Sequence, residues 1–165
     1  MGKGDQRWAN ALRQAHFPPE RNYLDAHITL FHHLPPQHWP EIKRELALMA
    51  SQYARPLATM SEVMMLGRGV AYRIESPILL AMRDRLAEAF HGLLIPQDQA
   101  QPRLHITVQN KVKPAEAKAL HAELSAEFAI REIAVTGLSA HYYRSGPWEH
   151  IGDYLFRGKC APDGY

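Results

Sequence analysis

A four-residue pattern that occurs twice limits how this chain can fold. His27-Ile28-Thr29-Leu30 is repeated 78 residues later as His105-Ile106-Thr107-Val108. In each copy a Leu or Val follows seven residues after the histidine, a proline follows nine residues after it, and a helical pattern comes next. The repeat therefore predicts two equivalent halves around residues 26–53 and 104–128, each made of a strand, a loop and a helix.

The rest of the chain divides into short alternating elements. Helical spacing predicts helices over residues 8–14 and 40–53, and two more that begin at Ser76-Pro77 and at Pro114. Strands are predicted over residues 26–31, 57–66, 70–75 and 104–108, with a last hairpin of residues 133–143 and 148–156 around Ser145-Gly146-Pro147. This mixture predicts an α+β fold. We expect one bilobal domain over residues 1–165, with two pseudo-symmetric lobes of mainly antiparallel sheet, helices outside and a central cleft.

Composition limits the kinds of partner. Apolar residues make up 46% of the 165 residues and charged residues 22%, which is typical of a chain with a packed core. The net charge of +2 argues against broad neutralisation of duplex nucleic acid, but it allows a site for one or two phosphates. With no apolar run of 18 residues, no apolar leader and only Cys160 as a thiol, we expect a cytoplasmic monomer without membrane association or an internal disulfide.

The repeat also places polar side chains in a defined way. Side chains alternate along a strand, so His27 and Thr29 share one face while Ile28 and Leu30 point to the core, and the second copy repeats this arrangement. Packing alone explains the apolar positions of the repeat but not its polar ones. Two imidazoles at one cleft suit general acid–base catalysis, and two hydroxyls can donate to phosphate oxygens.

On these two motifs the chain resembles the two-histidine (2H) phosphoesterase superfamily, of the 2′-5′ RNA ligase type. The resemblance implies metal-free cleavage or ligation of phosphoesters at the 2′ position, including opening of 2′,3′-cyclic phosphates, on RNA ends or small nucleotides. It implies His27 and His105 as the catalytic acid–base pair and Thr29 and Thr107 as phosphate-binding residues, with no cofactor. Members commonly carry an arginine five residues after the second histidine, where this chain has Asn110.

Several other residues are candidates for substrate contacts. Strand parity places Phe31 beside the first motif and Gln109 beside the second, so that Phe31 could stack on a base and Gln109 could bind a base edge. In the last hairpin, Tyr143 and Trp148 could form an aromatic wall and Arg144 a phosphate-binding cation. Arg103, just before the second motif, is a further candidate cation. The alternative for Phe31 and Gln109 is that they only line the cleft, and the alternative for the aromatic residues of the hairpin is cross-strand packing.

Two other classes of function stay open. A cluster of His27, His32, His33 and His38 could hold a metal for a metal-dependent hydrolase, although no carboxylate stands at a ligand-like spacing. A non-catalytic protein that binds RNA ends or nucleotides could also keep the same cleft. Two titratable side chains favour catalysis over binding alone, because a binding protein needs cations more than imidazoles.

Overall fold

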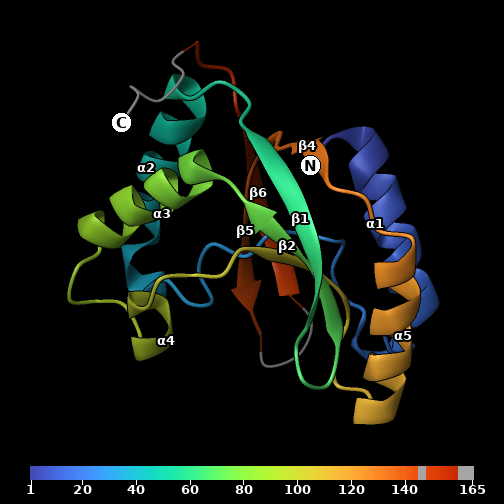
Figure 1. The fold of residues 1–165 in the computed structure, drawn as a ribbon. Helices are drawn as coiled ribbons and strands as arrows, with labels where there is room; N and C mark the ends of the chain where they lie inside the picture. The colour runs from blue at the N-terminus through green and yellow to red at the C-terminus, as the bar shows by residue number, and fades with distance from the viewer. Residues whose placement is uncertain (145–147, 160–165) are drawn as a thin grey trace. The chain divides into compact units, whose positions relative to one another are not determined.

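The computed structural model describes residues 1–144 and 148–159 (Figure 1). Its α-helices are α1 (Lys3–His16), α2 (Trp39–Gln52), α3 (Pro77–Ala89), α4 (Pro96–Gln99) and α5 (Pro114–Ala126), with 3₁₀ turns η1 (Pro19–Arg21) and η2 (Pro36–His38). Its strands are β1 (Leu57–Met65), β2 (Val70–Glu75), β3 (His105–Gln109), β4 (Arg131–Ala134), β5 (Gly137–Tyr143) and β6 (Trp148–Leu155). The expected turn at residues 145–147 and the lone Cys160 lie outside the described residues. None of the described helices is both long and apolar enough to cross a bilayer.

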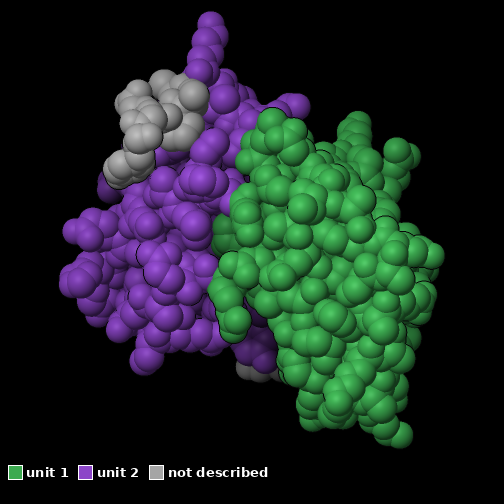
Figure 2. All heavy atoms as spheres, in the orientation of Figure 1, with its two compact units in different colours: residues 1–29, 57–75, 103–134 green, residues 30–56, 76–102, 135–165 purple. Residues whose placement is uncertain are grey.

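The chain separates into two compact units, which Figure 2 colours green and purple. Unit 1 consists of residues 1–29, 57–75 and 103–134, and unit 2 of residues 30–56, 76–102 and 135–165. Both copies of the repeated motif thus lie in unit 1, up to Thr29 in the first copy. The helix that follows the first motif, α2, belongs to unit 2, whereas the helix that follows the second, α5, belongs to unit 1.

Unit 1 is built on a four-stranded antiparallel sheet in the order β3-β2-β1-β4. Helix α1 packs against β3, and α5 packs against β1 and β2, so both helices cover the sheet (Figure 1). Apolar side chains of the strands and of α5 fill the space between them. The core includes Met60, Tyr72, Ile74, Ile106, Val108, Leu120 and Ile133, each at most 5% exposed.

A glycine turn positions β3 against β2 in this sheet. Gly67, at a positive φ of 76°, reverses the chain after β1. A Cβ at Gly69 would overlap the backbone carbonyl of Gln109 at the end of β3. Only glycine permits this close approach of the two backbones, so the turn at Gly67-Arg68-Gly69 also fixes the end of the strand that carries the second motif.

Unit 2 combines helices with a two-stranded antiparallel sheet of β5 and β6. Helix α2 packs on both strands. Arg85 of α3 joins α3 to α2, since its Nη1 donates to Gln52 Oε1 at 2.7 Å. The start of α3 is capped as predicted, because Ser76 Oγ accepts a hydrogen bond from the backbone N–H of Leu79 at 3.3 Å.

The α+β class and the antiparallel pairing are confirmed, but two predicted strands differ from the structure. Residues 26–31 do not form a strand, and only Ile28 makes a bridge, to Ile106. The reason is that side chains satisfy the backbone on both sides of Ile28. Asn10 accepts from the N–H of Ala26, and Asp98 accepts from the N–H groups of His32 and His33.

The strand predicted over residues 133–143 is two strands of different sheets. β4 ends at Ala134 in the sheet of unit 1, and β5 begins at Gly137 in the sheet of unit 2. Between them, the N–H of Val135 donates to the carbonyl of Pro56 at 2.9 Å. Both strands present apolar side chains to a core, so the apolar pattern continues from β4 into β5. The sequence pattern therefore does not show where one sheet ends and the other begins.

Candidate active site

The second motif lies on β3 with the alternation that its sequence predicts. Ile106 and Val108 are fully buried, and His105 and Thr107 are only partly buried. β2 holds this strand in register, with Ile106 opposite Tyr72 and Thr107 opposite Ala71. The apolar side chains of β3 are thus buried in the core of unit 1. Because side chains alternate along a strand, His105 and Thr107 point to the opposite face.

The first motif lies along the other edge of β3. Ile28 pairs with Ile106 in an antiparallel bridge. Residues next to the bridged pair lie opposite one another, so the bridge places His27 across from Thr107 and Thr29 across from His105. In a regular antiparallel pair, side chains directly opposite share a face with Cβ atoms about 4.5–5.5 Å apart, and diagonal neighbours, here the two histidines, are separated by about 7–8 Å. The structure therefore brings all four predicted residues together on one face.

Polar side chains of α1 hold the first motif in place of a full strand ladder. Asn10 Oδ1 accepts from the N–H of Ala26 at 2.7 Å, and Gln6 Nε2 donates to the carbonyl of Ala26 at 2.8 Å. Gln6 also donates to Asn10 Oδ1 at 3.2 Å. Both backbone groups of the residue just before His27 are thus bonded to the helix, which orients the motif.

The two imidazoles make the same backbone contact. His27 Nδ1 lies 2.7 Å from the carbonyl of Asp25, and His105 Nδ1 lies 2.7 Å from the carbonyl of Arg103, two residues earlier in each case. A carbonyl only accepts, so each Nδ1 carries the proton and donates it. In the neutral ring Nε2 then carries a lone pair and can take a proton, and in the charged ring it can give one. Both histidines therefore have the tautomer that a proton-transfer pair needs.

A buried arginine of α1 binds the backbone of the second motif. Arg13 of α1 is 5% exposed, and its Nη1 donates to the carbonyl of Thr107 at 2.9 Å. Its Nε donates to Asn22 Oδ1 at 3.1 Å, and its guanidinium carbon lies 4.2 Å from the centre of the Phe17 ring. Burial lowers the pKa of Arg13, and the charge of Asp25 opposes this shift. Arg13 thus places a cation and one hydrogen bond at the backbone of Thr107, and its second hydrogen bond goes to the side chain of Asn22.

The surroundings of His27 disfavour its charged form. Loss of hydration is the largest cause that lowers the pKa of His27 below the usual 6.5, and the hydrogen bond to the Asp25 carbonyl opposes it. The charges of Arg13 and of His105 lower the pKa of His27 further. His27 is therefore neutral at pH 7, with its Nε2 lone pair available.

The sequence did not predict the three α1 residues that hold the site. Gln6, Asn10 and Arg13 recur at intervals of four and three residues, which places them on one face of the helix. This spacing was the signal available. Such a polar stripe on a helix is usually its solvent face, however, and nothing in the sequence distinguishes a stripe that holds a neighbouring loop.

The other candidates near the motifs lie in different environments. Gln109 is 7% exposed and its Oε1 has no hydrogen-bond partner among the described residues. A bulge in β3 interrupts the alternation before it, because Val70 pairs with Gln109 and the next residue, Ala71, pairs with Thr107. Strand parity therefore does not place Gln109 beside Thr107. Arg103 supplies the carbonyl that His105 binds.

The remaining candidates for substrate contacts belong to unit 2. Phe31 packs under a cation of its own unit, with the guanidinium carbon of Arg83 5.0 Å from its ring centre. Tyr143, Arg144 and Trp148 lie on the β5–β6 hairpin of unit 2. Their roles toward a substrate stay predictions.

Two of the histidines considered for a metal site, His27 and His32, use Nδ1 in contacts of their own. His32 Nδ1 lies 3.0 Å from Asp98 Oδ1, and the buried Asp98 carboxylate also accepts the N–H groups of His32 and His33. Asp98 therefore ties residues 32–33 to α4. Across residues 1–144 and 148–159, no group of three or more His, Cys, Asp or Glu side chains is arranged to hold a metal ion.

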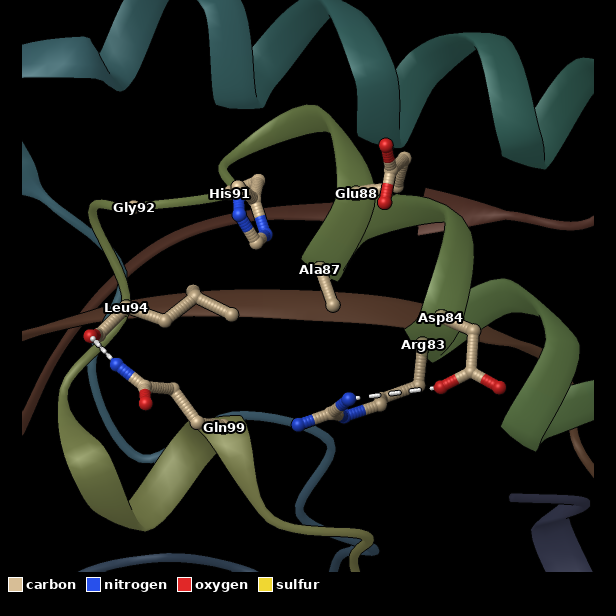
Figure 3. Close-up of a pocket in the computed structure, with 8 residues that line it drawn as sticks. All are labelled: Arg83, Asp84, Ala87, Glu88, His91, Gly92, Leu94 and Gln99. Carbon is tan, nitrogen blue, oxygen red and sulfur yellow. Dashed lines mark hydrogen bonds and ion pairs between the residues drawn. The ribbon is translucent and has the colours of Figure 1, made fainter.

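Two surface hollows lie within single units, and neither is lined by a motif residue. A hollow of about 530 Å³ in unit 2 has Arg83 and Asp84 at one end, joined by an ion pair of 3.4 Å, and Gln99 bonded to the carbonyl of Leu94 at the other (Figure 3). A second hollow, of about 300 Å³, is lined in unit 1 by rings that include Trp8 and Tyr72.

This fold and the paired histidines define a class, and comparison with known proteins identifies it. The family model of the 2′-5′ RNA ligase superfamily matches residues 3–146. The chain belongs to this superfamily. None of the curated proteins compared matches the sequence. Among solved structures, the fold is similar to that of TT0787 of Thermus thermophilus, with 16% identity over 97% of this chain and 96% of that chain and a TM-score of 0.67.

Proposed function

We propose that this chain is a metal-independent phosphoesterase that acts on 2′-linked or 2′,3′-cyclic phosphates of RNA ends or small nucleotides. The observation that carries the proposal is the shared geometry of the two imidazoles. They lie on one face, and each is bonded through Nδ1 to the carbonyl two residues earlier. Membership in the 2′-5′ RNA ligase superfamily supports this class of substrate.

The proposed reaction opens a cyclic phosphate with water. His27 Nε2 takes a proton from the water molecule whose oxygen attacks phosphorus. The bond between phosphorus and one ribose oxygen breaks, and His105 Nε2 gives its proton to that oxygen. The lowered pKa of His27 supports its assignment as the base, since a base must be neutral before the reaction.

The threonines bind the phosphate in this scheme. Thr29 and Thr107 lie on the same face as the imidazoles, each opposite the histidine of the other motif. Their hydroxyls donate to the non-bridging oxygens, on which negative charge shifts in the transition state. Each motif thus supplies one histidine for proton transfer and one hydroxyl for phosphate binding.

The repeat supports two pseudo-symmetric lobes around a central cleft as part of this proposal. The two motif segments meet through Ile28 and Ile106, while the helices that follow them belong to different units. The enzyme would act as a cytoplasmic monomer, and its partner would be an RNA terminus or a small nucleotide.

The pH dependence of cyclic phosphate opening tests the assignment of the base. Because the pKa of His27 is lowered, His27 stays neutral at pH values where an ordinary imidazole takes up a proton. We expect kcat/KM to fall on the acidic side with an apparent pKa below 6.5, and to fall again on the alkaline side as the acid loses its proton. Both limbs belong to the coupled pair rather than to single residues.

The same assay separates metal-free from metal-assisted chemistry. Protein dialysed against EDTA is assayed from about pH 5 to 9, on both sides of the unperturbed histidine pKa. The proposal requires an unchanged rate after dialysis. Loss of activity that zinc or manganese restores would show a metal-dependent hydrolase instead.

A further inference from the structure

Arg103 lies on the same face of unit 1 as the polar residues of the second motif. Leu104 and Ile106 are buried, whereas Arg103 is exposed and His105 is partly buried, so the alternation of β3 extends back to Arg103. The N–H of Ile74 donates to the carbonyl of Leu104 at 2.9 Å, which continues the pairing with β2 to the residue next to Arg103. Arg103 thus precedes His105 by two residues on one face, or about 6.8 Å along the strand.

Two arginines of unit 1 share this face but differ in their partners. Arg73 of β2 lies directly opposite His105. Its guanidinium is paired with two carboxylates, at 3.0 Å from Glu62 and 3.7 Å from Glu75. The Arg103 side chain forms no ion pair or hydrogen bond with the part of the chain that the structure describes. Arg103 therefore keeps its donors for an anionic ligand.

The other end of the candidate site carries a negative charge. Asp25 precedes His27 by two residues, just as Arg103 precedes His105. Asp25 is exposed, and its carbonyl accepts the hydrogen bond of His27 Nδ1. The two motifs run antiparallel, so Asp25 and Arg103 lie beyond opposite ends of the four motif residues. The site thus has a positive end beside His105 and a negative end beside His27.

We propose that Arg103 binds the 5′-phosphate of the nucleotide whose 2′,3′-cyclic phosphate is opened. In a displacement at phosphorus, the attacking and leaving oxygens lie roughly in line. With the water at His27 and the leaving oxygen at His105, the ribose lies on the His105 side. The 5′-phosphate belongs to the same ribose, so it extends toward Arg103 and away from the carboxylate of Asp25.

This contact selects the class of substrate. In an RNA strand, the 5′-phosphate of the last nucleotide is the diester that joins it to the preceding one. The enzyme therefore favours RNA ends and 5′-phosphorylated nucleotides over nucleoside cyclic phosphates that lack this group. The inference deepens the proposed function, and it rests on that function for the substrate and for His105 as the acid.

Steady-state opening of two matched substrates tests the proposal. Adenosine 2′,3′-cyclic phosphate is compared with the same compound carrying a 5′-phosphate, and the measured quantity is the ratio of their kcat/KM values. The unsubstituted protein is expected to favour the 5′-phosphorylated compound. Arg103→Ala is expected to lower this ratio about tenfold, the lower end of the range for a hydrogen bond to a charged group, since the site is exposed. Arg103→Lys should keep part of the preference, because it keeps the charge.

Arg73→Ala is the matched control, since Arg73 lies on the same face but is paired with two carboxylates. It is expected to leave the ratio unchanged. A ratio near one in the unsubstituted protein, or an equal fall in Arg73→Ala and Arg103→Ala, would overturn the proposal.

A binding measurement keeps this test separate from the proposed activity. Isothermal titration calorimetry compares adenosine 2′-monophosphate with adenosine 2′,5′-bisphosphate, which have no cyclic phosphate to open. We expect the bisphosphate to bind about tenfold more tightly and Arg103→Ala to remove this difference. If neither cyclic compound is turned over but the difference is present and is lost in Arg103→Ala, the proposed activity fails and the phosphate site stands. Equal affinities for the two ligands would overturn the site even in an active enzyme.

Discussion

Replacing either His27 or His105 with alanine is expected to lower kcat for cyclic phosphate opening by about 10²–10⁴-fold, the range that a positioned acid or base contributes. Each variant removes one of the two Nε2 atoms that transfer protons in the proposed reaction. Alanine at Thr29 or Thr107 should cost less, about 10- to 150-fold, since it removes one hydrogen bond to a charged group, worth about 1.5–3 kcal/mol. Steady-state rates of the four variants provide the comparison.

Thermal unfolding of the same variants separates chemistry from stability. Neither His27 nor His105 is one of the buried residues that form the core. Their alanine variants are expected to melt close to the unsubstituted protein. Near-normal turnover in either histidine variant would mean that the repeated motif is structural.

Replacing Arg13 with methionine is expected to destabilise the protein and raise the pKa of His27. Methionine keeps a flexible apolar chain but leaves the carbonyl of Thr107 and the Oδ1 of Asn22 without their donor. Loss of the bond to Thr107 alone costs about 1.5–3 kcal/mol. Without the nearby cation, the imidazolium form of His27 becomes less unfavourable, so its pKa moves toward 6.5. The acidic limb of kcat/KM should move to higher pH with it.

Arg13→Lys is the control for this effect, since it keeps the charge but not the planar donor group. It should retain most of the lowering of the His27 pKa and lose part of the stability. Urea unfolding gives the change in the free energy of unfolding, and the NMR titration of the His27 ring gives its pKa directly. An unmoved His27 titration in Arg13→Met would show that Arg13 supports the fold without acting on the histidine.

The sequence predicted the second motif more accurately than the first. Strict alternation from His105 to Val108 matches the burial of β3, because β2 pairs with His105, Ile106 and Thr107 in succession. The first motif has the same letters, yet it makes only the bridge at Ile28. Its backbone is held by Asn10 and Asp98, which come from distant positions in the chain. Local patterns do not show such contacts between a side chain and a distant backbone.

In the candidate site, Arg13 also makes a contact with a distant part of the chain that a local pattern does not predict. An arginine on the polar side of a short helix predicts solvent exposure, but Arg13 is 5% exposed and binds Thr107, 94 residues later. The His-x-Thr repeat was visible because its chemistry is local and occurs twice. The contacts of Arg13 depend on where α1 packs against β3. The repeat therefore predicted four candidate side chains, and the structure was needed to show what orients them.

To test whether this chain opens 2′,3′-cyclic phosphates with paired histidines, the four nucleoside 2′,3′-cyclic phosphates and a 2′-5′-linked dinucleotide are followed by ³¹P NMR. The reaction is run in ¹⁸O-labelled water with EDTA-treated protein. We predict that at least one cyclic phosphate is converted to a single monophosphate isomer that carries one ¹⁸O atom, and that His105→Ala protein does not convert it. Substrates that bind but remain intact would contradict the account and identify a nucleotide-binding protein without this activity.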